Sequence, residues 1–255
     1  MTLRRPIIGA SLLCALCFCA LGAASASATT LHVCSAFENG VTTTAQRYTT
    51  SHCEPGTTSV TGAFGTKPIP AVNTKVTTTA TKPFKLRGTV AGVAVTLECK
   101  KLESPGATAT NEEVEGKMRA KGVGKLVYTE CIVVAPAEKK CVVKEGKVST
   151  KNIESLSEDI GEVMRVKYTP TEAGIFAEIT IEKCTVLALN GTFPVKGADI
   201  GFPVQSEGMA TSSVVFTEAS SKEGGLTFAG NPAFLEGEGH AVMEGTDETL
   251  AYETP

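Results

Sequence analysis

Apolar and polar residues alternate with a period of two along several segments of this chain. Residues 93–99, 164–168 and 175–181 each direct apolar side chains to one face and largely polar side chains to the other. The apolar positions are Val93, Val95, Leu97, Cys99, Met164, Val166, Tyr168, Ile175, Ala177, Ile179 and Ile181. This alternation predicts antiparallel strands with one face on a core and the other in water.

Short polar and Gly-rich segments separate these strands at close intervals. Examples are KLESPGAT, TPTEAG, QSEG, SSKEGG and AGNP, and Asn190-Gly191 is the strongest hairpin signal. Many short strands with such turns predict an all-β protein, an antiparallel β-sandwich or barrel-like fold with little helix. Only residues 152–163, NIESLSEDIGEV, have apolar positions near helical spacing, and they fit a strand followed by a loop equally well.

The first 28 residues have the layout of a secretory signal peptide. Arg4 and Arg5 precede an uncharged apolar stretch, and Ala26 and Ala28 fit the small-residue positions of an A-x-A cleavage site. No later apolar run is long enough to span a membrane, so we expect no membrane span in the mature chain. The predicted protein is exported, and is either extracellular or held in the cell envelope.

The mature chain is expected to contain a small N-terminal segment and a large antiparallel β-domain. GTKPIPA, residues 65–71, is the best boundary because it combines Gly with two Pro residues. It separates residues 29–70, which hold the first two cysteines of the mature chain, from residues 71–255. Two packed β-modules that divide near residue 190 are an alternative for the larger part.

Six cysteines follow the signal peptide: Cys34, Cys53, Cys99, Cys131, Cys141 and Cys184. An even number in an exported chain predicts three disulfides. Nearness in sequence favours Cys34–Cys53 and Cys131–Cys141, which leaves Cys99–Cys184, although other pairings stay open. Cys184 falls on the polar face of its strand, so this set requires a β-bulge near Glu182 and Lys183.

A zinc site is the main alternative for the first cysteine pair. His32 and Cys34, together with His52 and Cys53, would supply four suitable ligands. Neither half has the usual ligand spacing, and an oxidising compartment favours a disulfide. We therefore predict no metal site and no cofactor.

The segment FLEGEGHAVMEG contains the best candidate for chemistry. Glu236, Glu238 and His240 would share one face of a strand. A histidine flanked by carboxylates can bind a metal or act as an acid–base pair, as it would in a secreted hydrolase. A solvated strand face is the simpler interpretation, so we assign no catalytic residue.

Lys139, Lys140 and Lys144 form a candidate basic surface beside Cys141. These lysines could bind an anionic polymer of the cell envelope, or they could keep edge strands from pairing with other chains. Another extracellular protein is an alternative partner. The net charge of −3 and the lack of aromatic residues among the lysines argue against nucleic acid.

The sequence also lacks the motifs of several enzyme classes. It contains neither G-x-S-x-G nor H-E-x-x-H, and no C-x-x-C follows residue 28. These absences favour a non-enzymatic protein.

Several segments resemble those of exported, disulfide-bonded, β-rich proteins of unknown function from high-GC soil actinobacteria: VAGVAVTLEC, YTECIVVAPAEKKCVVKEGKVSTKNIESL, AGIFAEITIEKC, CTVLALNGTFPVKG and SSVVFTEASSKEGGLTFAGNPAFLEGEG. The resemblance covers most of the mature chain and implies no particular chemistry. We expect a secreted or cell-envelope-associated structural or binding module. A secreted hydrolase is one alternative, and a small-ligand carrier, which would need an apolar cavity, is another.

Overall fold

The computed structural model of the chain describes residues 29–36, 47–49, 53, 59, 61–69, 73–160, 163–206, 209–245 and 250–253. Strands make up 69% of the structure and helices 9%, and the strands pair in antiparallel fashion. The predicted all-β class with little helix and three disulfides is therefore confirmed. The predicted signal peptide and His52 lie outside the described residues.

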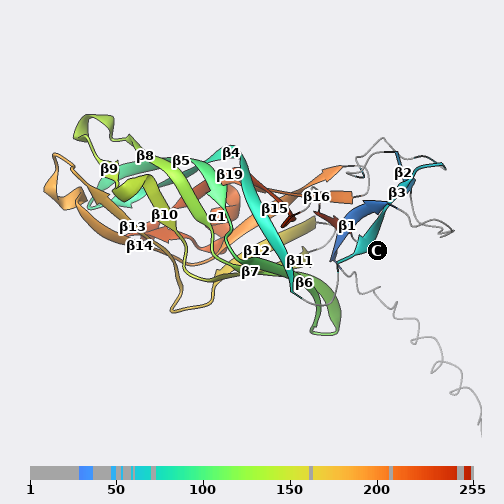
Figure 1. The fold of residues 1–255 in the computed structure, drawn as a ribbon. Helices are drawn as coiled ribbons and strands as arrows, with labels where there is room; N and C mark the ends of the chain where they lie inside the picture. Colours follow the sequence, from blue (N-terminus) through green and yellow to red (C-terminus); the bar gives the residue numbers. More distant parts are fainter. Residues whose placement is uncertain are drawn as a thin grey trace, which may run out of the picture.

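Eight antiparallel strands close into a barrel, because β4 pairs with β6 at one edge and with β19 at the other (Figure 1). In order around the barrel they are β4 (Thr74–Val90), β6 (Ala107–Val114), β7 (Lys117–Gly124), β11 (Ile153–Ile160), β12 (Val163–Pro170), β15 (Asp199–Ser206), β16 (Met209–Phe216) and β19 (Phe234–Met243). Closure pairs strands that would otherwise present open edges to other chains.

The barrel continues into a two-layered sandwich, at the left in Figure 1. The second half of β4 leaves β6 and pairs with β5 (Val93–Glu103), and the sheet goes on through β8 (Val127–Ala135) to β10 (Lys147–Ser149). The facing sheet has the order β18 (Asn231–Pro232), β17 (Thr227–Phe228), β14 (Gly191–Lys196), β13 (Ile175–Glu182) and β9 (Val142–Val143). Barrel and sandwich thus occur in one structure and share the long strand β4.

Four further strands extend from β16 at the opposite end of the molecule. They are β20 (Leu250–Glu253), β1 (Thr30–Ala36), β3 (Phe64–Pro68) and β2 (Arg47–Tyr48), paired in that order. Cys34 and Cys53 form a disulfide there, as the sequence predicts, and pack with Tyr48 in a small apolar cluster of their own. The division into domains at residues 70 and 190 stays a prediction.

Helical structure is confined to short elements. They are the α-helix α1 (Glu218–Gly224) and the 3₁₀ turns η1 (Ala137–Lys139), η2 (Lys144–Gly146) and η3 (Leu187–Leu189). SSKEGG, which the sequence predicts as a turn, lies largely in α1, and this helix begins with a capping box between Thr217 and Ser220. Residues 152–163, for which helix and strand were equal alternatives, contain the strand β11.

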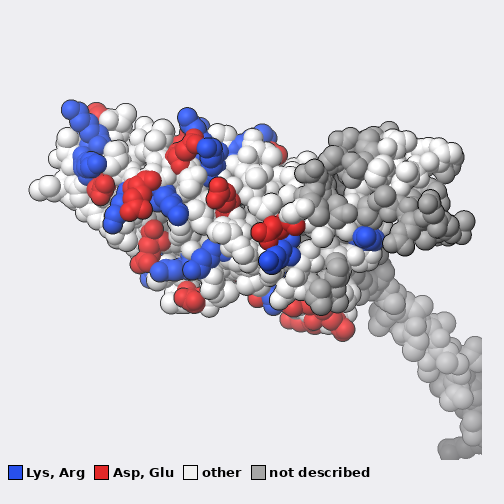
Figure 2. Space-filling model, in the orientation of Figure 1, with Lys and Arg blue, Asp and Glu red and all other residues white. Residues whose placement is uncertain are grey.

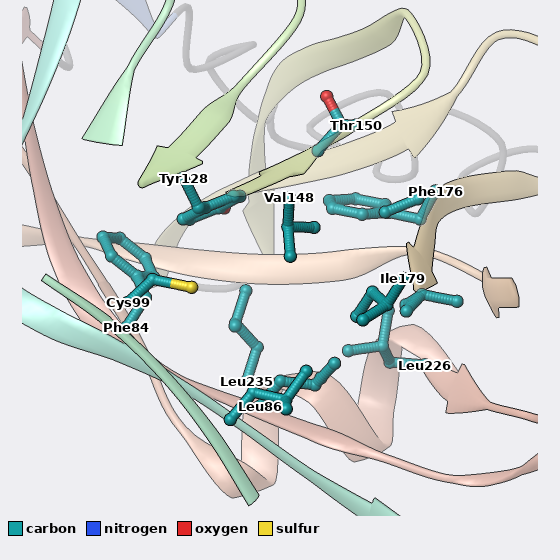
Figure 3. Close-up of a pocket in the computed structure, with 13 residues that line it drawn as sticks. Phe84, Leu86, Cys99, Tyr128, Val148, Thr150, Phe176, Ile179, Leu226 and Leu235 are labelled. Atoms are coloured by element: carbon teal, nitrogen blue, oxygen red, sulfur yellow. The ribbon is translucent and has the colours of Figure 1, made fainter. Parts of the chain in front are cut away.

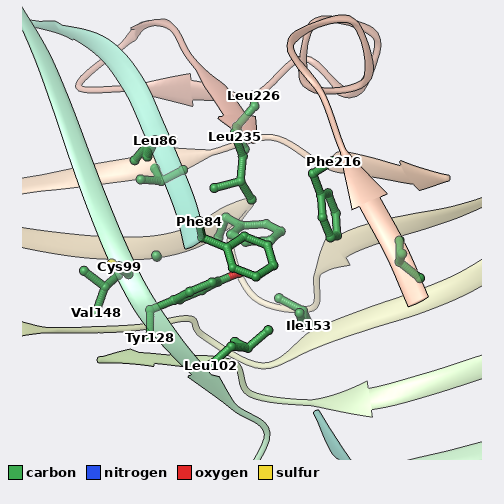
Figure 4. Packing of buried hydrophobic residues seen from close by; sticks show 14 of the residues in the cluster. Phe84, Leu86, Cys99, Leu102, Tyr128, Val148, Ile153, Phe216, Leu226 and Leu235 are labelled. Atoms are coloured by element: carbon green, nitrogen blue, oxygen red, sulfur yellow. The ribbon is translucent and has the colours of Figure 1, made fainter. Parts of the chain in front are cut away.

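An aromatic cluster fills the junction between barrel and sandwich (Figure 4). The ring of Phe84 on β4 lies 5.2 Å from that of Tyr128 on β8 and 5.9 Å from that of Phe216 on β16, measured between centroids. Tyr168 on β12 extends the cluster, with its ring 5.2 Å from Phe216. These contacts join the two parts of the fold in one continuous core.

Two predicted disulfide pairings are wrong. The structure joins Cys99 to Cys131 and Cys141 to Cys184, in place of Cys99–Cys184 and Cys131–Cys141. Cys99 and Cys131 are direct partners in the register of β5 and β8, with Cα atoms 4.0 Å apart. Directly opposed residues of an antiparallel pair bring their side chains close, and this register is not visible in the spacing of cysteines along the chain.

The backbone just before Cys184 directs this side chain to the interior. It does so without the β-bulge that the sequence predicts near Glu182 and Lys183. β13 ends at Glu182, and Lys183 has a positive φ of 61°. The left-handed residue breaks the alternation, so Cys184 is buried although its strand parity points outward.

The segment around Asn190-Gly191 is not the tight hairpin that the sequence predicts. β13 and β14 are joined by residues 183–190, which include η3. The Asn190 side chain accepts a hydrogen bond from Cys184 N at 2.9 Å and donates one to Cys184 O at 3.1 Å. The Asn190 side chain therefore takes the place of a backbone hydrogen-bond partner for Cys184, and it closes the base of a longer loop.

Candidate functional site

Glu236, Glu238 and His240 are half-buried on β19, on the wall of the barrel. Glu238 Oε2 lies 2.6 Å from Lys82 Nζ on the neighbouring strand β4. His240 Nδ1 lies 3.1 Å from Ser213 Oγ on β16, the strand on the other side. Glu238 and His240 therefore each contact a polar side chain on an adjacent strand.

Arg87 supplies the second cation of this face. Its Nη2 atom lies 2.8 Å from Glu236 Oε1 and 3.0 Å from Glu218 Oε2 at the start of α1. Hydrogen bonding to Lys82 lowers the pKa of Glu238 below its ordinary value, although partial burial opposes the shift. A carboxylate held in its ionised form is a poor proton donor, so this face does not offer a general acid beside His240.

The EGEG pattern of this strand has a structural cause in the barrel interior. A Cβ atom on Gly237 would lie 2.6 Å from Cδ1 of Phe84, and one on Gly239 would lie 3.3 Å from Cδ2 of Leu102. The two glycines make room for the junction core, while the glutamates that alternate with them pair with Lys82 and Arg87. The spacing of Glu236 and Glu238 thus follows from packing.

We expect Gly237→Ala to lower the free energy of unfolding by about 2 kcal/mol, because the added methyl group overlaps the Phe84 ring. Glu238→Gln is its matched control and should change stability by less than about 1 kcal/mol, since a half-exposed ion pair contributes little. Urea unfolding of the two variants measures both values. The opposite order of effects would contradict the structural origin of the motif.

An apolar cavity of about 50 Å³ lies between the two sheets of the sandwich (Figure 3). Phe84, Leu86 and Tyr128 line it from one sheet, and Phe176 and Ile179 from the other. Small-molecule sites typically have roughly 300–1,000 Å³, so this space does not fit the expected ligand of a carrier.

A second candidate surface lies at the free end of the sandwich, and we call it the stapled tip. It consists of residues 136–146, between β8 and β10, and residues 183–190, between β13 and β14. The Cys141–Cys184 disulfide joins the two segments, and Thr185 N donates a hydrogen bond to Lys139 O at 2.8 Å. The two loops are therefore held together by a covalent bond and a backbone contact.

Exposed apolar side chains gather at this end of the sandwich. Nine large apolar side chains are exposed among the described residues, and four of them are Ile132, Val134, Val142 and Leu187. Leu187, in η3 of the stapled tip, is 85% exposed. Exposed apolar side chains that are grouped mark contact surfaces, whereas single ones do not.

The same end carries basic side chains (Figure 2). Lys140 and Lys144 are exposed, and no ion pair within the described part of the chain engages either ammonium. Lys139 Nζ lies 3.7 Å from Glu138 Oε1, and Lys183 Nζ lies 4.0 Å from Glu182 Oε1. The structure thus places Lys139, Lys140 and Lys144 on one stapled loop, next to a second loop that carries Leu187.

One buried carboxyl group escaped the sequence analysis. Asp199 at the start of β15 is fully buried, and burial raises its pKa to about 7. Its Oδ1 atom accepts a hydrogen bond from Ile200 N at 2.9 Å, while Oδ2 has no partner among the described residues. No pattern in the sequence around Asp199 signals this burial.

The comparisons with known proteins identify no relative. No protein-family model matches the chain, and neither a curated protein nor a solved structure does. In the described part of the chain no helix is long and apolar enough to cross a membrane. Within the same residues, no three side chains of His, Cys, Asp or Glu are grouped so that they could hold a metal ion.

Proposed function

We propose that the chain is exported and acts outside the cell as a non-enzymatic binding module. Its contact surface is the stapled tip, and its partner is an anionic polymer of the cell envelope. Three disulfides support this location, because disulfides form and persist in oxidising compartments. The signal-peptide layout of residues 1–28 supports it independently.

The single observation that carries the proposal is the composition of the stapled tip. Exposed Lys140 and Lys144 offer cations to a polyanion, while Leu187 on the adjoining loop offers an apolar contact. The disulfide between the loops lowers the entropy that binding would otherwise cost, since the surface is already formed.

The two alternative functions receive less support. A hydrolase at Glu236, Glu238 and His240 would need a proton donor, and both glutamates are already paired with cations. A small-ligand carrier would need a larger cavity than the one of about 50 Å³ in the sandwich.

The experiment is a binding titration with polyglycerol phosphate, an anionic phosphodiester polymer, and with uncharged dextran as the comparison. We expect the protein to bind the anionic polymer and not dextran, and to lose affinity as salt screens the lysines. K140E/K144E should weaken binding by about tenfold or more, because two attractive charges become repulsive.

The matched control is K75E/K125E, which makes the same charge change at two exposed lysines. Lys75 lies on β4, and Lys125 lies between β7 and β8. It should leave binding nearly unchanged, since these residues lie outside the stapled tip. Equal losses in the two double variants would show that net charge alone governs binding and would contradict the proposed surface. No binding at low salt would contradict the proposed partner.

A further inference from the structure

Thr29 lies in a seam of the barrel where two neighbouring strands separate. The ladder between β7 and β11 covers only Lys121–Gly124 against Ile153–Leu156. Beyond it, Thr29 O accepts hydrogen bonds from Ala120 N on β7 at 2.8 Å and from Ser157 Oγ on β11 at 3.1 Å. Thr29 thereby fills part of the gap between the strands, and only 1% of its surface is exposed.

The side chain of Thr29 is directed to a carboxylate. Its Oγ1 atom lies 2.7 Å from Oδ1 and 2.6 Å from Oδ2 of Asp159, near the end of β11. The following residues are fixed as well, because the Asn111 side chain bonds both Leu31 N, at 2.7 Å, and Leu31 O, at 2.9 Å. The start of the described chain is thus hydrogen-bonded to the barrel strands β6, β7 and β11.

Thr29 is also the residue that follows the A-x-A motif at Ala26 and Ala28. We propose that cleavage after Ala28 makes Thr29 the first residue of the mature protein, and that its new α-ammonium group forms an ion pair with Asp159 in the barrel seam. This inference rests on the proposed export of the chain.

The cleavage is a hydrolysis by a signal-peptidase-type protease with water as the co-reactant. The bond between the Ala28 carbonyl carbon and Thr29 N breaks, and the hydroxyl group of water joins that carbon. The nitrogen gains the remaining proton and, at neutral pH, a second one from solvent, while the new Ala28 carboxyl group loses its proton. An uncharged amide nitrogen is thereby replaced by an ammonium ion beside an existing carboxylate.

The distance allows the two charges to attract each other. The α-nitrogen is three bonds from Oγ1, so it lies within roughly 6 Å of the Asp159 carboxylate. Arg119 on β7 also lies at the seam, where its Nη1 atom donates a hydrogen bond to Ser157 O at 3.0 Å. Asp159 is the carboxylate that Thr29 already contacts, so it is the anion nearest to the new ammonium group among the side chains that Thr29 contacts.

The contacts at the seam would therefore depend on where the chain is cut. A chain cut one residue later would lack the contacts of Thr29 with Ala120, Ser157 and Asp159. A chain cut one residue earlier would carry its ammonium on Ala28 instead of on Thr29.

The first test is N-terminal sequencing of the protein recovered from the medium of a secreting host that expresses the full chain. We expect Thr29 as the first residue. A different first residue in an exported protein would overturn the inference without touching the polymer-binding proposal. A protein that stays in the cell uncleaved would contradict the proposed export.

The second test does not depend on export. Chains that begin at Thr29 and at Ala28 are released from a fusion by a protease that leaves no extra residue. We expect acylation of the α-amine by an amine-reactive ester to be about tenfold slower for the Thr29 chain, because a paired and buried amine is poorly accessible. Equal rates in the two chains would overturn the ion pair, and this comparison needs no substitution.

Asp159→Asn separates pairing from simple burial. It should speed acylation of the Thr29 chain severalfold and leave the Ala28 chain nearly unchanged. Glu113→Gln, an exposed neutralisation on the nearby strand β6, is the matched control and should alter neither rate. A Thr29 amine that stays equally slow in Asp159→Asn would show burial without pairing and would contradict the inference.

Discussion

Replacing Asp199 with asparagine is expected to raise the free energy of unfolding by about 4 kcal/mol at pH 8 and by little at pH 4. Asp199 is fully buried, and its Oδ2 atom has no hydrogen-bond partner among the described residues. Burial raises its pKa to about 7, although the hydrogen bond from Ile200 N acts in the opposite direction. The native protein therefore takes up a proton at this site more readily than the unfolded chain does.

The sign of the effect follows from the two pKa values. The carboxyl group ionises near its ordinary pKa of 3.8 in the unfolded chain and near 7 in the native protein. Its contribution to stability is full below pH 3.8, falls as the pH rises toward 7, and is constant above that. Asparagine does not ionise, so the Asp199→Asn variant should lack this fall.

Urea unfolding between pH 4 and pH 8 measures the effect, with Glu103→Gln, an exposed neutralisation, as the matched control. The stability curves of the Asp199→Asn variant and the original protein should diverge as the pH rises. Parallel curves would show that Asp199 is ionised without cost in the folded protein.

Phe84→Ala is expected to lower the free energy of unfolding by about 4 kcal/mol. The Phe84 side chain is 2% exposed and contacts Tyr128 of the sandwich and Phe216 of the barrel. Truncation removes this aromatic contact from both parts and leaves a cavity at their junction. Cooperative unfolding followed by circular dichroism measures the loss.

Phe234→Ala is the matched control, because Phe234 is half-buried on β19 and lies outside the junction cluster. It should lower the free energy of unfolding by about 1 kcal/mol. Equal losses in the two variants would contradict the central role of the Phe84 ring.

The faces of the strands could be predicted from the sequence, because alternation with a period of two records which side of each strand is buried. Val95, Leu97 and Cys99 are buried as the pattern indicates, and so are Ile179 and Ile181. This information is local. It predicts the class of the fold, but it does not show which strands pair with each other.

Closure of the barrel could not be predicted, because it depends on strands that are far apart in sequence. The adjacent strands β4 and β19 are the first and last barrel strands in sequence, and no local pattern specifies that pairing. The cysteine pairing failed for the same reason, since Cys99 meets Cys131 through the register of β5 and β8.

The candidate site at Glu236, Glu238 and His240 was found from spacing alone, and its spacing has another cause. Phe84 requires glycine at position 237, and this contact joins residues distant in sequence. The lysines of the stapled tip were visible in the sequence. Their juxtaposition with Leu187 was not, because it depends on the unexpected Cys141–Cys184 bridge.

The central claim is that the Cys141–Cys184 bridge unites two loops in one surface, and disulfide mapping tests it most directly. Trypsin places each of the four relevant cysteines in a separate peptide: Gly88–Lys100, Leu126–Lys139, Cys141–Lys144 and Cys184–Lys196. Mass spectrometry of the unreduced digest should find the first peptide linked to the second and the third linked to the fourth. A link between Leu126–Lys139 and Cys141–Lys144 would contradict the account, because the two loops would then not be joined.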